Sequence, residues 1–492
     1  MACKRAASEG RIKRCWFFLT RSVFTVGLLS LAWFLFRTGA KPSRAGYPCQ
    51  RAAAASGYAW LATYVIPLLP FARTANGKRI DRRALLISLL LLVAVAAGWG
   101  GWTNGWFHRP SPTRLAVALV LPERIGTGPS VSELFVAEGV TPEDCGVPNL
   151  IASMSEKGLE FYQSGSGTGI IGPNDVVVLK INSQWNRRGG TNTDLLKAVI
   201  QVIIDHPAGF AGEIVVADNG QAQFGSFGGG GSFDWSQSNA EDEEQSAQDV
   251  VDSFVESFAV STYLWDSISW TEVNEYDQND TEDGYVVVQP IDKRSNSYAT
   301  YPKFRTENGT FISLRPGVWD PIARRYDSDR LKLINMPVLK PHSIYGVTGC
   351  IKHYMGVTSD YITNKLGARA HYSIMQGGMG TVMAGSRYPD LNILDAIWVS
   401  LSPGVGPSVS YSQATRLDVI AASKDPVALD YWATKYILMQ GAEQLGKSAT
   451  SFDPDGTNSF AEYLRTSAGI LKEEGFPVTY TESSMSVHVS EL

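Results

Sequence analysis

Short apolar runs rich in β-branched residues recur throughout the chain beyond residue 110. They are too uniformly apolar for strands with one face in water, and they suit strands buried on both faces, as in a parallel sheet. The intervals carry helical patterns, such as the apolar spacing of residues 193–205 and the Asp-Pro start of residues 425–438. This alternation predicts an α/β domain with a mainly parallel sheet and helices on both faces. The runs expected to form strands are residues 114–120, 175–181, 213–217, 284–289, 331–336 and 417–421.

The first 110 residues differ from the rest in both charge and hydropathy. They carry 16 Lys and Arg against two acidic residues, whereas residues 111–492 carry 27 basic and 46 acidic residues. Three apolar segments in this basic part, at residues 15–36, 52–72 and 84–102, have about the length of a bilayer-spanning helix, ~20 residues. We therefore expect a membrane anchor of about three helices at residues 1–110 and a separate α/β domain at residues 111–492.

The positions of the basic residues predict an orientation for this anchor. Basic clusters lie before the first apolar segment and between the second and third, and such clusters favour the cytoplasmic side. Three spans would then place the acidic domain outside the inner (cytoplasmic) membrane. A cleavable signal peptide is the alternative for the first segment, although the later segments would still anchor the chain. The net charge of −19 on the large domain repels phosphates, so nucleic acid is not an expected partner.

Cysteine content and glycine-rich stretches add smaller constraints. The large domain contains Cys145 and Cys350, which cannot supply the four thiolates of an iron–sulfur cluster, so no such cluster is expected. A disulfide between them is left open. The glycine-rich and then acidic residues 224–249 are expected to form a surface loop. Residues 165–172 are also expected to be a loop, because they lead into a strand instead of opening a helix after one.

Charged and amide side chains follow several of the expected strands, and ligands of open α/β sheets bind beyond the carboxyl ends of strands. We therefore expect these groups to gather at one edge of the sheet. A lysine buried there needs an acidic partner, an anionic ligand or a lowered pKa. The alternative is a purely structural pair between Asp218 and Lys180. The groups in question are Lys180, Asn182, Asp218, Asn219, Lys340 and His342.

One glycine-punctuated apolar stretch holds two lysines and two histidines. Histidine exchanges a proton near neutral pH, and a desolvated lysine attracts an anion or forms a Schiff base. His342, together with Lys340 or Lys352, is therefore expected to bind and deprotonate a small carboxylate, and these three are the candidate catalytic residues. His371 and Asp395 are further candidates for an acid/base or metal set. An ordinary hydrogen-bonded histidine is the alternative for His371, as it is for the histidine next to Lys352.

The order of these motifs resembles the DUF362 family, a domain family named for its unknown function, over residues 115–438. That family shows a K-x-H, a G-x-T turn and then a Lys-Asn pair, and His353 stands here in place of the asparagine. Many members carry ferredoxin-type cysteine clusters, which this chain lacks, so the resemblance implies no electron-transfer role. The residues matching the central motif are Lys340, His342, Gly346, Thr348 and Lys352. With the matching segment ASKDPVALD, the expected ligand-binding residues are Lys180, Asn182, Asp218, Asp425 and Asp430.

A more distant similarity concerns the same segment. His342, Gly346 and Lys352 form an H-x3-G-x5-K pattern similar to that of nickel-pincer lactate racemases, in which a histidine is the acid/base and a lysine holds the cofactor. The glycine pair and the Pro-Gly flanking that lysine in the racemases are absent, because Ile351 and His353 flank Lys352. The nickel cofactor is therefore not implied, and cofactor and metal stay unassigned.

Two functions compete on these grounds. The first is a membrane-anchored, extracytoplasmic enzyme acting on a small anionic substrate, with Lys180, Lys340, His342 and Lys352 near the site. The second is a non-catalytic protein that binds an anionic ligand or an envelope polymer as a scaffold. Turnover of a small carboxylate that varies with pH would separate them, because only the enzyme allows it.

Overall fold

The computed structural model describes residues 30–34, 54–57, 60, 117–128, 131–165, 167–221, 231–363 and 370–492. Contacts divide the chain into two units, Met1–Thr113 and Arg114–Leu492. The third expected membrane span, residues 84–102, lies outside the described residues, as does most of the first two. Within the described part of the chain, no helix combines the length and apolar character needed to cross a bilayer.

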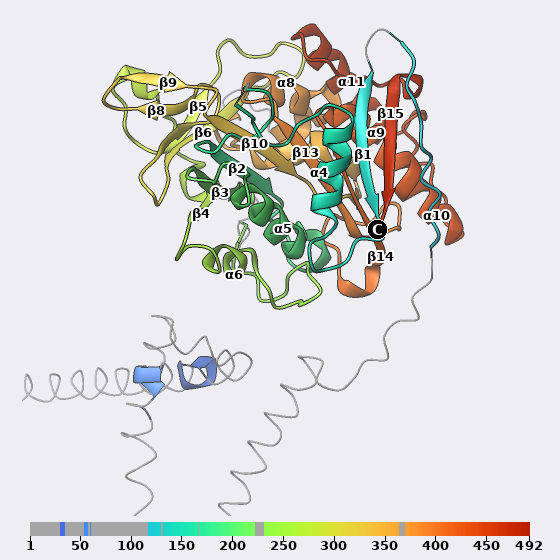
Figure 1. Cartoon of the computed structure of the whole chain (residues 1–492), viewed down its shortest axis with the longest axis horizontal. Coiled ribbons are helices and arrows are strands. Elements are labelled where there is room, and N and C mark those ends of the chain that lie inside the picture. The colour runs from blue at the N-terminus through green and yellow to red at the C-terminus, as the bar shows by residue number, and fades with distance from the viewer. Residues whose placement is uncertain are drawn as a thin grey trace, which may run out of the picture. The chain divides into compact units, whose positions relative to one another are not determined.

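An eight-stranded sheet forms the centre of the larger unit (Figure 1), in the order β15, β1, β14, β13, β10, β2, β3, β4. Strand β14 runs antiparallel to both of its neighbours, and all the other adjacent pairs are parallel. The first and last of the described strands, β1 and β15, lie side by side. The strands are β1 Ser132–Glu138, β2 Val176–Ile181, β3 Glu213–Asp218, β4 Ala259–Leu264, β10 Leu331–Met336, β13 Leu391–Val399, β14 Thr415–Ser423 and β15 Met485–Glu491.

Alternate residues of the central strands point into two separate cores. Val176 and Val178 of β2 belong to one hydrophobic core, and Val177 and Leu179 belong to the other. Helices α4, α5 and α6 cover one face of the sheet, and α8, α9 and α11 cover the other (Figure 1). The prediction of an α/β fold with a mostly parallel sheet is confirmed. The helices are α4 Val147–Glu156, α5 Thr193–Ile204, α6 Ala247–Asp252, α8 Gly378–Gly385, α9 Pro426–Ala433 and α11 Ser459–Glu473.

Four of the six expected strands lie in this sheet, as β2, β3, β10 and β14. Residues 284–289 do contain a strand, β5, but it does not belong to the main sheet as expected. It lies in a separate antiparallel sheet with strands β5 to β9. In that sheet each strand pairs with the next one along the chain, so no crossover helix is needed. Its strands are β5 Gly284–Val287, β6 Thr300–Arg305, β7 Phe311–Ser313, β8 Gly317–Asp320 and β9 Arg325–Asp327.

The prediction of a strand at residues 114–120 is also wrong for residues 117–120, the part of this range that the structure describes. Residues 117–120 form no strand, and side-chain amides satisfy their backbone instead. The amides of Gln440 and Gln444, in α10 (Gln440–Gln444), exchange hydrogen bonds with the backbone of Val120 and Ala118. Apolar β-branched composition predicts a strand equally well with or without a neighbouring strand, which explains the error.

The helix predictions are confirmed at their starting residues. Asn192 caps α5, its side chain accepting from the backbone N–H groups of Asp194 and Leu195. Asp425 caps α9 in the same way, and Pro426 occupies the first helical position. The helix then continues through a π-helical turn, Thr434–Met439, into α10.

The two cysteines of the large domain are free and lie in different cores. Cys145 is in the core beneath α4 and α5, and Cys350 is in the core on the opposite face, so the sheet separates the two thiols. Of the expected loop at residues 224–249, residues 224–230 lie outside the described residues. The rest is irregular until α6, which begins at Ala247 behind a capping box formed by Ser246 and Asp249.

Candidate functional site

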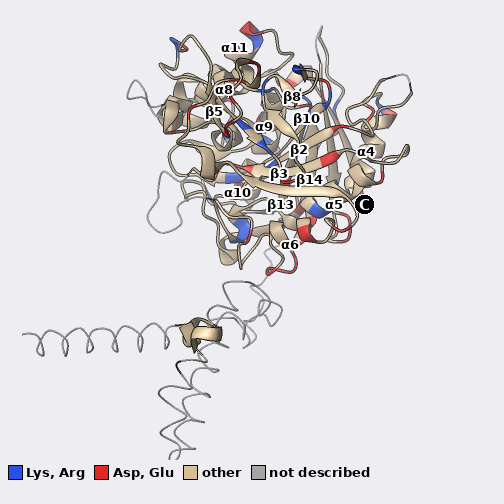
Figure 2. Cartoon of the chain, turned by 90° about the vertical axis from the view of Figure 1, so that its left-hand side faces the viewer, with Lys and Arg blue, Asp and Glu red and all other residues tan. Residues whose placement is uncertain are grey.

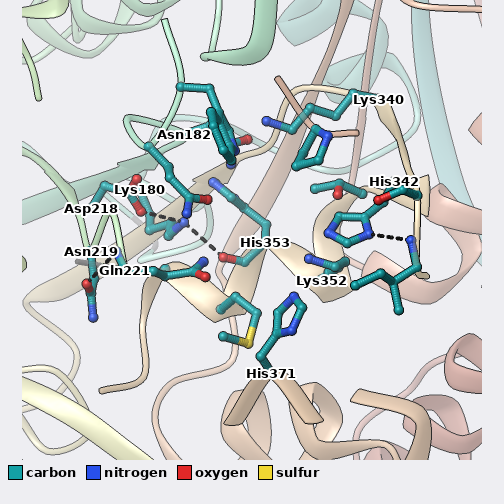
Figure 3. A pocket seen from close by; sticks show the side chains of 18 residues that line it. Lys180, Asn182, Asp218, Asn219, Gln221, Lys340, His342, Lys352, His353 and His371 are labelled. Atoms are coloured by element: carbon teal, nitrogen blue, oxygen red, sulfur yellow. Dashed lines mark hydrogen bonds and ion pairs between the residues drawn. The ribbon is translucent and has the colours of Figure 1, made fainter. Parts of the chain in front are cut away.

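A cavity of about 240 Å³ lies where β2 and β3 end (Figure 3). The hairpin formed by β11 (Lys340–His342) and β12 (Gly346–Thr348), and the short helix α7 (Cys350–His353), supply a further part of its polar wall. Groups from three distant parts of the chain thus meet at the carboxyl edge of the sheet, where open α/β sheets bind ligands. The expected residues that line it are Lys180, Asn182, Asp218, Asn219, Lys340, His342, Lys352, His353 and His371.

Lys180 and Asp218 form a buried ion pair in this wall. Lys180 Nζ lies 2.8 Å from Asp218 Oδ1 and donates to the carbonyl of His353 at 2.9 Å. The other carboxylate oxygen accepts from the backbone and the hydroxyl of Ser183, at 2.7 and 2.9 Å. Burial lowers the pKa of Lys180 to about 8, against the opposing effect of Asp218. The pair between Asp218 and Lys180 that was considered from the sequence is therefore present.

His342 sits at the start of the tight turn between β11 and β12. Its Nδ1 accepts from the backbone N–H groups of Ile344 and Tyr345, at 3.2 and 3.3 Å. The proton of the neutral ring is therefore on Nε2, since Nδ1 is an acceptor. Burial, followed by the positive charge of Lys352, lowers the pKa of His342 to about 2. This differs from the expected proton exchange near neutral pH, because the ring remains a neutral hydrogen-bond donor there.

Lys340 extends from β11 and is almost completely buried. Its ammonium group donates to the carbonyl oxygen of Gly189, in the loop that follows β2. Burial and the positive charge of Lys352 lower the pKa of Lys340 to about 7. A carbonyl is a weaker partner for an ammonium than a carboxylate is, so Lys340 retains the capacity to bind an anion.

Lys352 lies on α7 with its side chain 6 % exposed. Within the described ranges, Nζ has no carboxylate or hydrogen-bond partner, and it stands over the ring of Tyr345 at 5.6 Å from the centroid. Burial lowers the pKa of Lys352 to about 7, and the charge of Lys180 acts in the same direction. Lys352 therefore combines accessibility to the cavity with an amine that is partly neutral at pH 7.

Asp425 and Asp430, both expected to bind ligand, do not line the cavity. Asp425 caps α9 and also accepts from Ser132 and from the backbone of Thr479. Asp430 accepts from the backbone N–H groups of Cys350 and Ile351, at 2.5 and 3.0 Å, and burial raises its pKa to about 7. Asp430 thus anchors the first turn of α7, which carries Lys352, and supports the cavity from behind.

The remaining candidates have mixed positions. Asp395 lies on β13, does not line the cavity, and accepts from the backbone of Asn192 and Ile397. His371 does line the cavity, with its ring centroid 5.9 Å from that of His342, and burial followed by Lys352 lowers its pKa to about 4. In the parts of the chain that the structure describes, no group of three His, Cys, Asp or Glu residues is placed to hold a metal ion.

Some residues that shape the cavity wall could not be recognised from the sequence. At Gly356 an added Cβ would lie 2.2 Å from Asp218 Oδ1 and 2.3 Å from Lys180 Nζ, so only glycine lets the backbone approach the ion pair so closely. Its carbonyl also accepts from the backbone N–H of Asn219. Ser183, which holds Asp218, was likewise not predicted. Loop residues of these types are common, so composition alone did not distinguish them.

The cavity is locally electropositive within an acidic domain. Both signs of charge are scattered over the elements of the larger unit (Figure 2). Among the residues lining the cavity there are three lysines and a single carboxylate, Asp218, which is already paired with Lys180. Among the described residues, no carboxylate lies within ion-pair distance of Lys340 or Lys352, although Asp218 and Asp395 attract Lys340 from farther away. An anion between them would favour their protonated forms.

Fold and cavity together define an α/β domain protein with a lysine-rich cavity at the carboxyl edge of its sheet. Residues 326–435 match the family described as Domain of unknown function (DUF362), so the chain carries a DUF362 domain there. This segment is shorter than the resemblance expected from the sequence, and it contains Lys340, His342 and Lys352 but neither Lys180 nor Asp218. The match gives no support to the similarity with lactate racemases. No curated protein matches the chain.

Proposed function

We propose that the cavity binds a small anion of the carboxylate class, held by Lys340 and Lys352. The observation that carries this proposal is the placement of two buried lysines in one cavity whose lining carboxylate is already committed to Lys180. Burying a charge without a partner is costly. A bound carboxylate would supply the missing partner with charge-assisted hydrogen bonds.

The size of the cavity limits the ligand. Its volume of about 240 Å³ lies below the ~300–1,000 Å³ of pockets that hold drug-sized molecules. The exposed Ile344, which also lines the cavity, marks its solvent side. A compound with a few heavy atoms suits this space better than an envelope polymer, which favours a small-molecule ligand over the scaffold alternative.

The same groups have the properties needed to transform the ligand. Amines with a pKa of about 7, such as those of Lys340 and Lys352, exchange protons efficiently at neutral pH. A neutral histidine that donates from Nε2 can polarise a carbonyl or carboxylate oxygen without itself titrating. We therefore propose an enzyme that moves a proton on a small carboxylate, with Lys352 as the base and His342 as the donor. Non-catalytic binding of the same anion is the second candidate.

Membrane attachment is part of this proposal and rests on the amino-acid sequence. The apolar segments at residues 15–36, 52–72 and 84–102 would anchor the chain, and the charge distribution favours an extracytoplasmic position for the large unit. The ligand would then be met outside the inner membrane.

Binding and turnover can be tested separately on the full-length chain. Lactate and acetate should bind, acetamide should not, and the Lys340→Met/Lys352→Met double variant should lose at least about tenfold in affinity for the two anions. Lys472→Met, at an exposed position on α11, is the matched control and should bind normally. Equal binding of acetamide would overturn the proposal. Deuterium incorporation at the α-carbon of lactate in heavy water would identify the enzyme, and binding without exchange would favour the non-catalytic alternative.

A further inference from the structure

We propose that Lys352 forms an imine with its ligand, and that the ligand is a 2-oxo acid or a similar small carboxylate with an adjacent carbonyl. This inference rests on the proposed anion-binding function and adds the substrate class and a covalent step. It assigns to Lys352 the role of a nucleophile in addition to that of a charge.

The positions of the four buried lysines in the described ranges single out Lys352. Lys180 is paired with Asp218, and Lys340 donates to a carbonyl oxygen. Lys303 lies on β6 and does not line the cavity. It donates to the backbone of Asn274 and to both the backbone and the carboxylate of Asp280. Lys352 alone among these four has no such bond, although its side chain is also buried. Its lone pair is therefore available for attack on a ligand within the cavity.

The surroundings of Lys352 keep the amine reactive. Lys180 and Lys340 line the same cavity, and neighbouring positive charges together with desolvation favour the neutral amine. The aromatic face of Tyr345 offers only a weak cation–π contact at 5.6 Å. The amine is therefore held inside the cavity without being neutralised by a fixed acid.

The other polar groups suit the two ends of a 2-oxo acid. The ammonium of Lys340 would bind the carboxylate, while Nε2–H of His342 would donate to the carbonyl oxygen. Figure 3 shows the ring of His342 beside Lys352, with both side chains in the cavity. A carbonyl polarised by His342 would thus lie next to the attacking amine.

The step balances without an oxidant or reductant. The neutral amine of Lys352 adds to the carbonyl carbon, and a proton moves from nitrogen to oxygen to give a carbinolamine. Loss of water then removes the former carbonyl oxygen together with both amine hydrogens, leaving a C=N bond. Protonation of the imine nitrogen by solvent gives an iminium, which withdraws electrons from the two carbons bonded to the former carbonyl carbon.

Reductive trapping tests this inference directly. The full-length protein is incubated with pyruvate and cyanoborohydride, and the product is analysed by intact mass and peptide mapping. We expect one adduct per chain, on the peptide containing Lys352. The adduct should be lost in Lys352→Arg, which keeps the charge but not the nucleophilic amine, and in Lys352→Met, which has a similar shape. Lys472→Arg should be labelled like the original protein, because residue 472 is exposed on α11.

The outcomes separate this inference from the proposed function. If lactate and pyruvate bind equally well and no adduct is trapped, imine formation is refuted while anion binding stands. If neither anion binds, both proposals fail. Adducts spread over exposed lysines, with equal yield in Lys352→Arg, would also overturn the inference. A site-specific adduct accompanied by lactate binding would support both.

Discussion

Lys180 Nζ and Asp218 Oδ1 lie 2.8 Å apart at the ends of two adjacent parallel strands, and both side chains are almost fully buried. The pairing of β2 with β3 places Lys180 opposite Ala217, one residue before Asp218. The backbone of Gly356 closes over the pair from the other side. This ion pair therefore forms a fixed wall against which Lys340 and Lys352 are arranged.

Replacing one partner of this ion pair should destabilise the fold more than replacing both partners together. Lys180→Met or Asp218→Asn leaves one buried group without its partner, and we expect each to cost about 3–5 kcal/mol in the free energy of unfolding. The double variant should lose less free energy of unfolding than the two single variants lose in sum. Denaturant unfolding of the three proteins measures this coupling. Strictly additive losses would show that the pair is not energetically coupled.

Substitution of Gly356 should disturb the same wall by steric means. Gly356→Ala places a Cβ within 2.3 Å of both members of the pair, so we expect a loss of about 1–3 kcal/mol in stability and weaker anion binding. Gly469→Ala is the matched control, because nothing lies within 4 Å of its added Cβ and it occupies an exposed helical position on α11. That control should gain up to about 1 kcal/mol. Equal effects at both positions would contradict the role given to Gly356.

Lys352 should make stability depend on pH in a defined direction. Its pKa in the folded chain is about 7, below the ordinary value of 10.5, so the unfolded state binds more protons between these two values. Stability without added anion should therefore rise from pH 7 toward pH 10. Lys352→Met removes this contribution and should be more stable than the original chain by at least about 2 kcal/mol at pH 6, since each pKa unit corresponds to about 1.4 kcal/mol. Melting curves at pH 6 and 9, with Lys472→Met as the control, measure this difference. A stability difference between Lys352→Met and the original chain that is as large at pH 9 as at pH 6 would contradict the prediction.

The orientation of the anchor can be tested with reporter fusions. A reporter placed after Gly77 should lie in the cytoplasm, and one placed after Gly105 should lie outside the inner membrane, because basic clusters favour the cytoplasmic side. The opposite pair of results would show that the second apolar segment, residues 52–72, does not cross the membrane and that the large unit lies in the cytoplasm.

The sequence predicted four of the eight strands of the central sheet, because burial on both faces leaves a continuous apolar pattern. Strands β2, β3 and β10 were recognised by this pattern. Strands β1, β4, β13 and β15 were not predicted, and in β1 Ser132 and Glu133 at the start obscure the apolar residues that follow. The antiparallel direction of β14 was also not predicted, because direction depends on how the chain connects to its neighbours and leaves no mark on composition.

The candidate site was predicted where it depends on strand ends. Lys180 and Asp218 meet because the carboxyl ends of parallel strands share one edge, and Lys340 reaches the same cavity from the hairpin that follows β10. The protonation state of His342 was not predictable, because it is set by two backbone N–H groups in a turn. Asp430 carries charge like a ligand-binding residue, and only the packing of α9 against α7 shows that it anchors a helix.

The pH dependence of anion affinity tests the central claim most directly. Calorimetric titration of the full-length chain with lactate should show affinity falling by at least about tenfold between pH 6 and 9, because Lys340 and Lys352, with pKa values of about 7, lose their charge over this range. Lys180 titrates nearby, with a pKa of about 8, but it remains paired with Asp218, whereas the pKa values of His342 and His371 lie below this range. The Lys340→Met/Lys352→Met variant should bind weakly at every pH. Undiminished affinity at pH 9, or full affinity in the double variant, would contradict the account.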